Sequence, residues 1–218
     1  MEKTFFDRFL SFLLIILVLA VLGGIGYLGY KYYQKYKINN DAAEFLDNEF
    51  EKYIADKDEY DEQQAIDEQG SDEKGPRGID TDGLKYRGYT VEGKIELPTV
   101  NLRYPVLEQM TDANELEVSI AIQYGVGLNK VGNTVLVGHN YRSGLFFGSN
   151  KKLNIGDSIF ITDTETGTRR EYKIFNKYTT EEGDTSYFNG TGSGKREVSL
   201  VTCQSNNKYR LIVLAREV

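Results

Sequence analysis

The sequence predicts a mainly all-β domain, built as a barrel or a sandwich, that follows an N-terminal transmembrane helix and an acidic linker. Three observations support this prediction: an uncharged apolar run near the N-terminus, a strongly acidic segment after it, and a series of short β-rich runs separated by turn residues. We place the anchor and its short tip in residues 1–38, the linker in 39–79 and the β-rich domain in 80–218.

The first element is a membrane anchor. The run from Phe9 to Tyr30 has 22 residues without a charge, and at a rise of about 1.5 Å per residue it spans a hydrocarbon core of roughly 30 Å. A cleaved signal peptide is the alternative, but its apolar region is usually only about 7–15 residues long. We therefore expect an uncleaved signal anchor. Lysines and arginines flank both ends, so charge alone leaves its orientation open.

The second element is the linker. From Asn39 onward, six apolar residues recur at helical spacing among acids and predict a short amphipathic helix: Ala42, Phe45, Leu46, Phe50, Tyr53 and Ile54. The stretch from Asp56 to Gly78 is acidic and poor in apolar residues. Such a segment buries too little surface to order itself, so we expect a solvated spacer.

The third element is the β-rich domain. A helix is expected over Ala113–Ile122 and a hairpin turn at Thr164–Gly167. The expected strands are Thr90–Glu96, Leu102–Leu107, Thr134–Val137, Ser158–Thr162, Arg170–Tyr178, Glu197–Thr202 and Tyr209–Ala215.

Charge and cysteine content exclude several classes of function. The net charge of −7 divides into +3 for residues 1–40, −12 for 41–73 and +2 for 74–218, so the β-rich domain has no strong basic excess and no nucleic-acid partner is expected. The single cysteine excludes an intrachain disulfide and a multi-cysteine metal site. Calcium sites made of carboxylates alone stay open.

Three side chains with catalytic chemistry share one structural context. Cys203 ends a predicted strand, Arg210 begins the next, and a hairpin loop over Gln204–Tyr209 would bring them together. His139, the only imidazole, follows the apolar strand Thr134–Val137. A thiolate attacks carbonyls, an imidazole protonates a leaving amine, and a guanidinium holds an oxyanion, which together favour acyl transfer.

Each of the three also has an ordinary interpretation. A lone cysteine on a strand is more often an inert core residue, a lone histidine is commonly structural, and an arginine often forms a surface ion pair. A non-enzymatic, membrane-tethered scaffold is therefore one alternative to the enzyme.

Read together, these segments resemble the sortases, the cell-surface transpeptidases of Gram-positive bacteria. The resemblance covers about residues 80–218. The run Ser199–Cys203 is similar to the family's T-L-x-T-C motif, with Ser199 in place of the first threonine, and Arg210 follows as the family's arginine does. Other similar segments are Asn133–Asn140 around the histidine, Ile95–Val106, Leu153–Asp157 and Asp184–Phe188.

The resemblance implies a closed eight-stranded β-barrel and a two-step reaction. Cys203, His139 and Arg210 would be catalytic, and Thr202, Asn140 and Ser186 would bind substrate. The enzyme would cleave an LPxTG-type sorting motif of a surface protein through a thioacyl intermediate and transfer it to an amine of the peptidoglycan precursor. The barrel would then lie outside the cell, on a single-pass membrane anchor with a cytoplasmic tip.

Departures from the family pattern bear on the subclass. The residues after the histidine are more like class B members, whereas the extra helix of that class is not evident. Pilin polymerisation is less favoured, because neither an Asp-Pro lid nor a C-terminal membrane helix is present. A cysteine endopeptidase that releases its product to water is a further alternative. No cofactor is expected, although Glu181, Glu182 and Asp184 could bind calcium as in some members.

Overall fold

A computed structural model describes residues 5–67, 83–204 and 208–218. The chain divides into two compact units, and the division falls between Asn40 and Asp41. The N-terminal unit consists of most of helix α1 (Phe5–Phe45), whose apolar side chains between Phe9 and Tyr30 are exposed. Within the described residues, one helix is long and apolar enough to cross a membrane. This agrees with the predicted anchor.

The helix continues without a break past the predicted anchor. After α1 comes a turn of π-helix, η1 (Leu46–Phe50), and then α2 (Glu51–Asp67). The expectation of an unordered spacer from Asp56 is therefore wrong as far as Asp67, and residues 68–78 lie outside the described part of the chain. Extending an existing helix fixes one residue per added hydrogen bond, and α2 is rich in good helix formers, so little tertiary burial is needed.

The segment from Asp41 onward belongs to the same compact unit as the barrel. The Phe45 ring lies 4.7 Å from that of Tyr86, and Lys94 lies 5.3 Å over the buried ring of Phe50 while its ammonium pairs with Glu51. The predicted amphipathic helix is thus present, and its apolar face packs on the β-domain. The boundaries predicted at 38/39 and 79/80 stay predictions, and the second lies outside the described residues.

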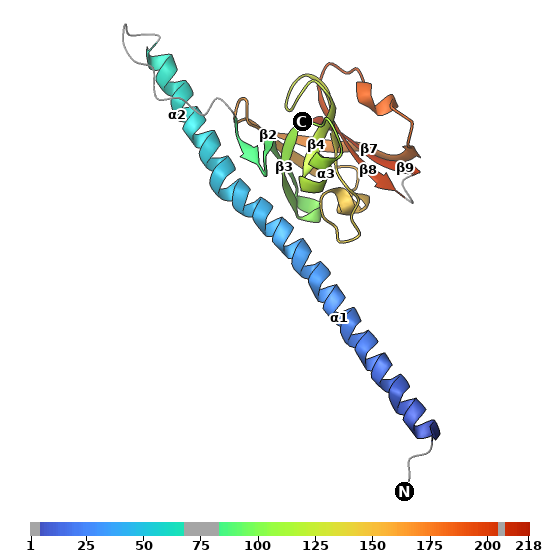
Figure 1. Ribbon diagram of the computed structural model, residues 1–218. Helices are drawn as coiled ribbons and strands as arrows, with labels where there is room; N and C mark the ends of the chain where they lie inside the picture. Colours follow the sequence, from blue (N-terminus) through green and yellow to red (C-terminus); the bar gives the residue numbers. More distant parts are fainter. Residues whose placement is uncertain (1–4, 68–82, 205–207) are drawn as a thin grey trace. The chain divides into compact units, whose positions relative to one another are not determined.

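Eight of the described strands close into a barrel (Figure 1). Its order is β2-β3-β4-β5-β8-β9-β7-β6, and β6 pairs back onto β2; the two-residue β1 adds to the other side of β2. In chain order the strands are β1 (Lys85–Tyr86), β2 (Tyr89–Leu97), β3 (Leu102–Gln109), β4 (Ile120–Gly125), β5 (Gly132–Val137), β6 (Ser158–Asp163), β7 (Arg169–Glu181), β8 (Arg196–Gln204) and β9 (Tyr209–Glu217).

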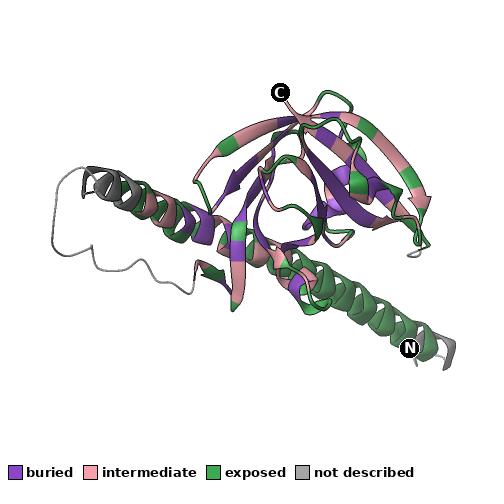
Figure 2. Cartoon of the chain, turned by 90° about the horizontal axis from the view of Figure 1, so that it is seen from above, coloured by how far each residue is buried: buried purple, intermediate pink, exposed green. Residues whose placement is uncertain are grey.

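In the described part of the chain, the connections between strands hold four short helical segments, and the strands bury most of the core. Figure 2 shows the buried residues concentrated along the barrel strands. The seven predicted strands are all present, each slightly longer than expected. The short helical segments are η2 (Pro98–Val100), α3 (Asn114–Val118), η3 (Phe147–Lys152) and η4 (Ser186–Asn189).

One predicted element has a different structure. The helix expected over Ala113–Ile122 is only the five-residue α3, and Ile120–Ile122 belongs to strand β4, which pairs parallel with β3 and antiparallel with β5. The run Ile120-Ala121-Ile122 is fully apolar because both faces of this strand are buried. Such a run lacks the alternation that marks a half-buried strand, so periodicity alone does not separate it from a helix.

The hairpin turn predicted at Thr164–Gly167 connects β6 to β7. Gly167 has φ +68°, and its N–H donates to the carbonyl of Asp163 at 3.1 Å, so the turn uses the left-handed conformation that glycine adopts at low cost.

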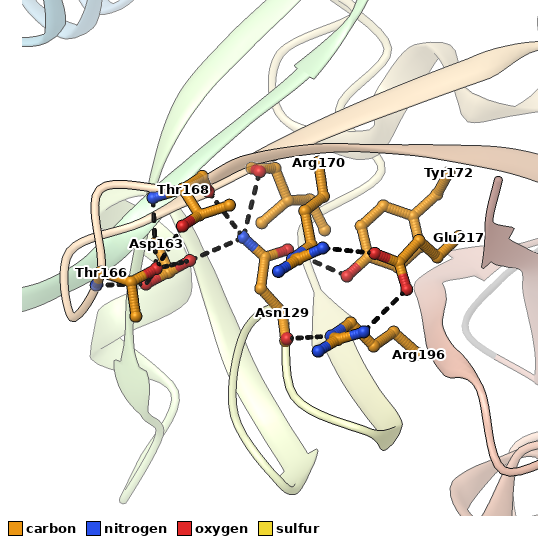
Figure 3. Close-up of polar contacts among 9 residues, drawn as sticks. Asn129, Asp163, Thr166, Thr168, Arg170, Tyr172, Arg196 and Glu217 are labelled. Atoms are coloured by element: carbon orange, nitrogen blue, oxygen red, sulfur yellow. Dashed lines mark hydrogen bonds and ion pairs between the residues drawn. The ribbon is translucent and has the colours of Figure 1, made fainter.

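A polar network connects the end of β6, the first half of β7, the start of β8 and the end of β9 (Figure 3). The amide of Asn129 donates to the Asp163 carboxylate at 2.7 Å, and its carbonyl oxygens accept from Tyr172 and Arg196. Arg196 reaches on to Glu217 at 3.0 Å. This network joins the start of β8 to the end of β9, which leaves the opposite strand ends for the predicted catalytic residues.

Candidate active site

Cys203 and Arg210 face each other across a strand pair. Strands β8 and β9 are antiparallel neighbours, and their register pairs Cys203 with Arg210. Residues directly opposite in an antiparallel pair project to the same side of the sheet. The predicted hairpin is therefore present, although residues 205–207 of its loop lie outside the described part.

His139 reaches the same strand end from the other neighbour of β8. Strands β5 and β8 are parallel, with Val137 opposite Val201. The ladder continues by one step because the Gly138 N–H donates to the Val201 carbonyl at 3.2 Å. Because the two strands are parallel, Gly138 then lies opposite Thr202, and His139 comes level with Cys203.

Strand alternation favours one face for the three residues. Cys203 follows Val201 by two residues in β8, and side chains two apart in a strand share a face; His139 lies two residues past Val137, the last residue of β5. All three predicted catalytic side chains are half-buried, so none is sealed in the core. Cys203 is a free thiol. The strand register thus brings Arg210 opposite Cys203 and His139 level with Cys203, although His139 and Arg210 lie 71 positions apart in the sequence.

Arg210 is held by a carboxylate from a neighbouring loop. Its guanidinium donates to Glu182 at 2.5 Å and to its own strand at the Tyr209 carbonyl. Glu182 follows strand β7 and its side chain is 64% exposed, whereas that of Arg210 is only 17% exposed. The guanidinium is therefore restrained close to the barrel while its ion-pair partner remains accessible to solvent.

Asn140 and Thr202 tie the histidine loop to the cysteine strand. The Asn140 amide donates to the Cys203 carbonyl at 2.6 Å. The Thr202 hydroxyl donates to the Gly138 carbonyl at 2.7 Å, and its side chain is buried. Both residues were predicted to bind substrate; in the structure their side chains bond the protein itself, and the substrate contact stays a prediction.

Ser186 begins the short helix η4, which lies over the same sheet face. Its N–H donates to Asp184 at 2.8 Å, and the neighbouring Tyr187 packs on Val135, Val201 and Ile212. Since Val201 shares its face with Cys203, η4 covers the sheet two residues before the thiol. This arrangement leaves the end of the face, with the three reactive side chains, beyond the edge of η4.

Two of the three acids considered as calcium ligands, Glu182 and Asp184, have protein partners. Besides Glu182, Asp184 accepts from the Thr180 hydroxyl and from Ser186, and these hydrogen bonds hold the pKa of Asp184 below its usual value. In the described ranges, no three His, Cys, Asp or Glu side chains are grouped as metal ligands.

Sequence reasoning missed two residues that contact the imidazole. Glu117, at the end of α3, has one carboxylate oxygen 3.0 Å from Nε2 of His139 and accepts from the Tyr141 hydroxyl on the other at 2.7 Å. Burial, with the nearby Glu117 carboxylate, raises the pKa of Tyr141 to about 12, so this hydroxyl stays a donor. No local motif marks Glu117, because it lies 22 residues before the histidine.

This arrangement has the parts that acyl transfer requires. A half-exposed thiol, an imidazole with an acidic partner and a restrained guanidinium lie at the same end of strands β5, β8 and β9. They match the roles of nucleophile, general acid and oxyanion stabiliser.

Comparison with known proteins points to one family. The model of the sortase domain family matches residues 95–218. Sortase A of Bacillus anthracis is 32% identical over 126 residues, which cover 56% of this chain and 58% of the relative. Sortase A of Listeria monocytogenes is 30% identical over 114 residues, covering 52% and 49%. The chain thus spans less than two thirds of the length of either relative.

Solved structures support the same fold. Sortase A from Corynebacterium diphtheriae superimposes with a TM-score of 0.54 at 26% identity, covering 60% of this chain and 61% of that one. A Clostridium perfringens sortase D5 transpeptidase superimposes with a TM-score of 0.57 over 84% of this chain and 99% of its own. At 20% identity, the second likeness concerns the fold alone.

Proposed function

Because this chain belongs to the sortase family, whose domain matches residues 95–218, we propose that it is a cysteine transpeptidase with Cys203, His139 and Arg210 as its catalytic residues. It cleaves an LPxTG-type sorting motif of a surface protein and transfers that protein to an amine of the cell-wall precursor. The observation that carries the proposal is the register of β5, β8 and β9, which favours a common face for all three side chains.

The proposed reaction has two acyl-transfer steps. The Cys203 thiolate attacks the threonine carbonyl carbon of the motif, the bond to the next residue's nitrogen breaks, and the imidazolium of His139 protonates the departing amine. The acceptor amine then attacks the thioester, its proton returns to His139, and the thiolate leaves. Arg210 stabilises the negative charge on the carbonyl oxygen in both steps.

The substrate lies, in this proposal, along the sheet face that η4 borders. Ser186 and Asn140 are both exposed, so each can contact a bound peptide. The buried Thr202 would act indirectly, because its hydroxyl holds the Gly138 carbonyl next to His139. The anchor in α1 then holds the enzyme in the cell membrane as a single-pass protein with an extracellular barrel, where both substrates are accessible.

The test uses the full-length protein in detergent micelles. A quenched LPxTG-type peptide is incubated with and without triglycine, and the product masses are measured. We expect a triglycine adduct when the amine is present, and we expect Cys203→Ala to abolish both cleavage and transfer. Thioacyl trapping should add the acyl mass to the only cysteine of the chain.

The outcomes separate the alternatives. Products released only to water, at every amine concentration, would identify a cysteine endopeptidase. Transfer to a pilin lysine in preference to triglycine would identify a pilin polymerase. An unreactive thiol and no cleavage of any sorting peptide would contradict the enzyme and favour a scaffold.

A further inference from the structure

Both carboxylate oxygens of Glu117 contact the loop after β5, which contains His139 and Tyr141. Its Oε1 lies 3.0 Å from Nε2 of His139, and its Oε2 accepts from the Tyr141 hydroxyl at 2.7 Å. The rings of these two loop residues lie 5.1 Å apart at a tilted angle. The carboxylate therefore grips the loop at two points, one of which is the proposed acid–base group.

We infer that Glu117 is a positioning residue, which holds the N–H of Nε2 and leaves Nδ1 of His139 to exchange protons with the reacting groups. This inference rests on the proposed function, because it assigns a partner to its general acid. The hydrogen bond made by one ring nitrogen decides which nitrogen carries the proton in the neutral ring. A carboxylate accepts only, so it selects the Nε2–H tautomer.

The proton balance follows from this assignment. The imidazolium carries a proton on each nitrogen, and the Nδ1 proton passes to the departing amine while the C–N electron pair goes to that nitrogen. The Nε2 proton stays on the ring and remains bonded to Glu117. When the acceptor amine attacks the thioester, its proton returns to Nδ1, and the positive ring is again next to the carboxylate.

The competing interpretation is a surface ion pair without a catalytic role. The side chains of His139 and Glu117 are 31% and 65% exposed, and exposed ion pairs contribute little to stability because water screens them. That small contribution makes the inference testable, because loss of the pair should leave the fold intact. A second contact, from Tyr141, also distinguishes this carboxylate from an isolated partner.

The experiment observes the ring directly. His139 is the only histidine, so full-length protein labelled with ¹⁵N-histidine in micelles gives one pair of ring nitrogen signals. These are recorded at a pH where the ring is neutral, for wild type, Glu117→Ala, Glu117→Gln and Tyr141→Phe. Glu165→Gln is the matched control, since Glu165 is 64% exposed and pairs with Lys130 at 2.7 Å on another loop.

We expect the Nε2–H tautomer in wild type and a tautomer mixture in Glu117→Ala. In peptide transfer, kcat of Glu117→Ala should fall about 10- to 100-fold, no more than the lower end of the roughly 10²–10⁴-fold that acid–base catalysis supplies, with KM changed less than about threefold. Glu117→Gln keeps an acceptor but not the charge and should be intermediate. Glu165→Gln should match wild type in both measurements.

Two results would overturn the inference: an Nδ1–H tautomer in wild type, or ring signals and kcat of Glu117→Ala that equal those of wild type. If Glu117→Ala does not fold, Glu117→Gln decides by the same two measurements. If wild type transfers no peptide, the proposed function fails, whereas the ring signals still decide whether Glu117 sets the tautomer.

Discussion

Cys203 and Arg210 form a directly opposed pair in the register of β8 and β9, although the loop between them is short. Opposed residues share a face, so in the proposed reaction the guanidinium needs no rearrangement of the backbone to approach the carbonyl under attack. The ion pair with Glu182 restrains it there.

Replacing Arg210 tests its role as oxyanion stabiliser. We expect Arg210→Ala to lower kcat/KM for peptide cleavage by about 10²–10³-fold, the usual cost of removing one such donor. Arg210→Lys keeps the charge but loses the planar fork and should recover only part of the activity. Initial rates with the quenched peptide measure both effects.

The control for Arg210 is the thiol itself. Iodoacetamide should alkylate Cys203 in Arg210→Ala, because the change removes a partner of the oxyanion and not the nucleophile. An Arg210→Ala enzyme with full activity would show that the guanidinium is not needed for catalysis.

The helical segment η1, which belongs to the same compact unit as the barrel, should contribute to its stability. Phe50 is fully buried, with Lys94 over its ring. We expect Phe50→Ala to cost about 3 kcal/mol and to lower Tm by roughly 6–12 °C for a domain of this size. Ile155→Ala is the control, because Ile155 is 68% exposed and its truncation should cost less than about 0.5 kcal/mol. Equal Tm values for the two variants would mean that the helix does not stabilise the barrel.

The local sequence pattern was sufficient to predict most of the barrel strands. Strands such as β6 and β7 combine β-branched or aromatic residues with a clear turn at Gly167, and both were predicted. Strand β4 was missed because Ile120-Ala121-Ile122 is buried on both faces and has no alternation. The helix over Asp56–Asp67 was missed because composition takes no account of the helix that already precedes it.

The residues of the candidate site likewise divide into those that the local sequence pattern could predict and one that it could not. Cys203, His139 and Arg210 lie at strand ends, and strand ends can be read from a sequence, so their meeting on one face could be anticipated. Glu117 could not, since its contact with His139 depends on the antiparallel pairing of β4 with β5, which puts the end of α3 beside the histidine loop. A partner set by tertiary structure has no signal in local spacing.

Acid should weaken the strand ends on the network side of the barrel. Burial alone raises the pKa of Glu217, but hydrogen bonds from Arg196 and Arg170 outweigh it, so the pKa lies below its usual value of 4.5. A carboxyl with a lowered folded-state pKa adds stability above about pH 4.5, and that stability is lost as the pH falls through the folded-state pKa. Wild type should therefore lose stability as the pH falls below about 4.5.

Glu217→Gln isolates this contribution. Thermal unfolding should show the variant less stable than wild type by about 1–2 kcal/mol at pH 7, and the difference should shrink as the pH is lowered toward 3. A difference that stays constant over this range would show that the titration of Glu217 does not contribute to acid sensitivity.

Asn140 has two possible roles that kinetics can separate. Its amide donates to the Cys203 carbonyl at 2.6 Å, so as a tie between the histidine loop and β8 it should affect the alignment of the reacting groups. We then expect Asn140→Ala to lower kcat about tenfold with little change in KM, because a small misplacement of catalytic groups costs rate. A substrate contact, as the sequence predicts, would raise KM instead. Asn154→Ala, which removes an exposed amide bonded to Lys152, should leave both constants unchanged, and a kcat and KM for Asn140→Ala equal to those of Asn154→Ala would exclude both roles.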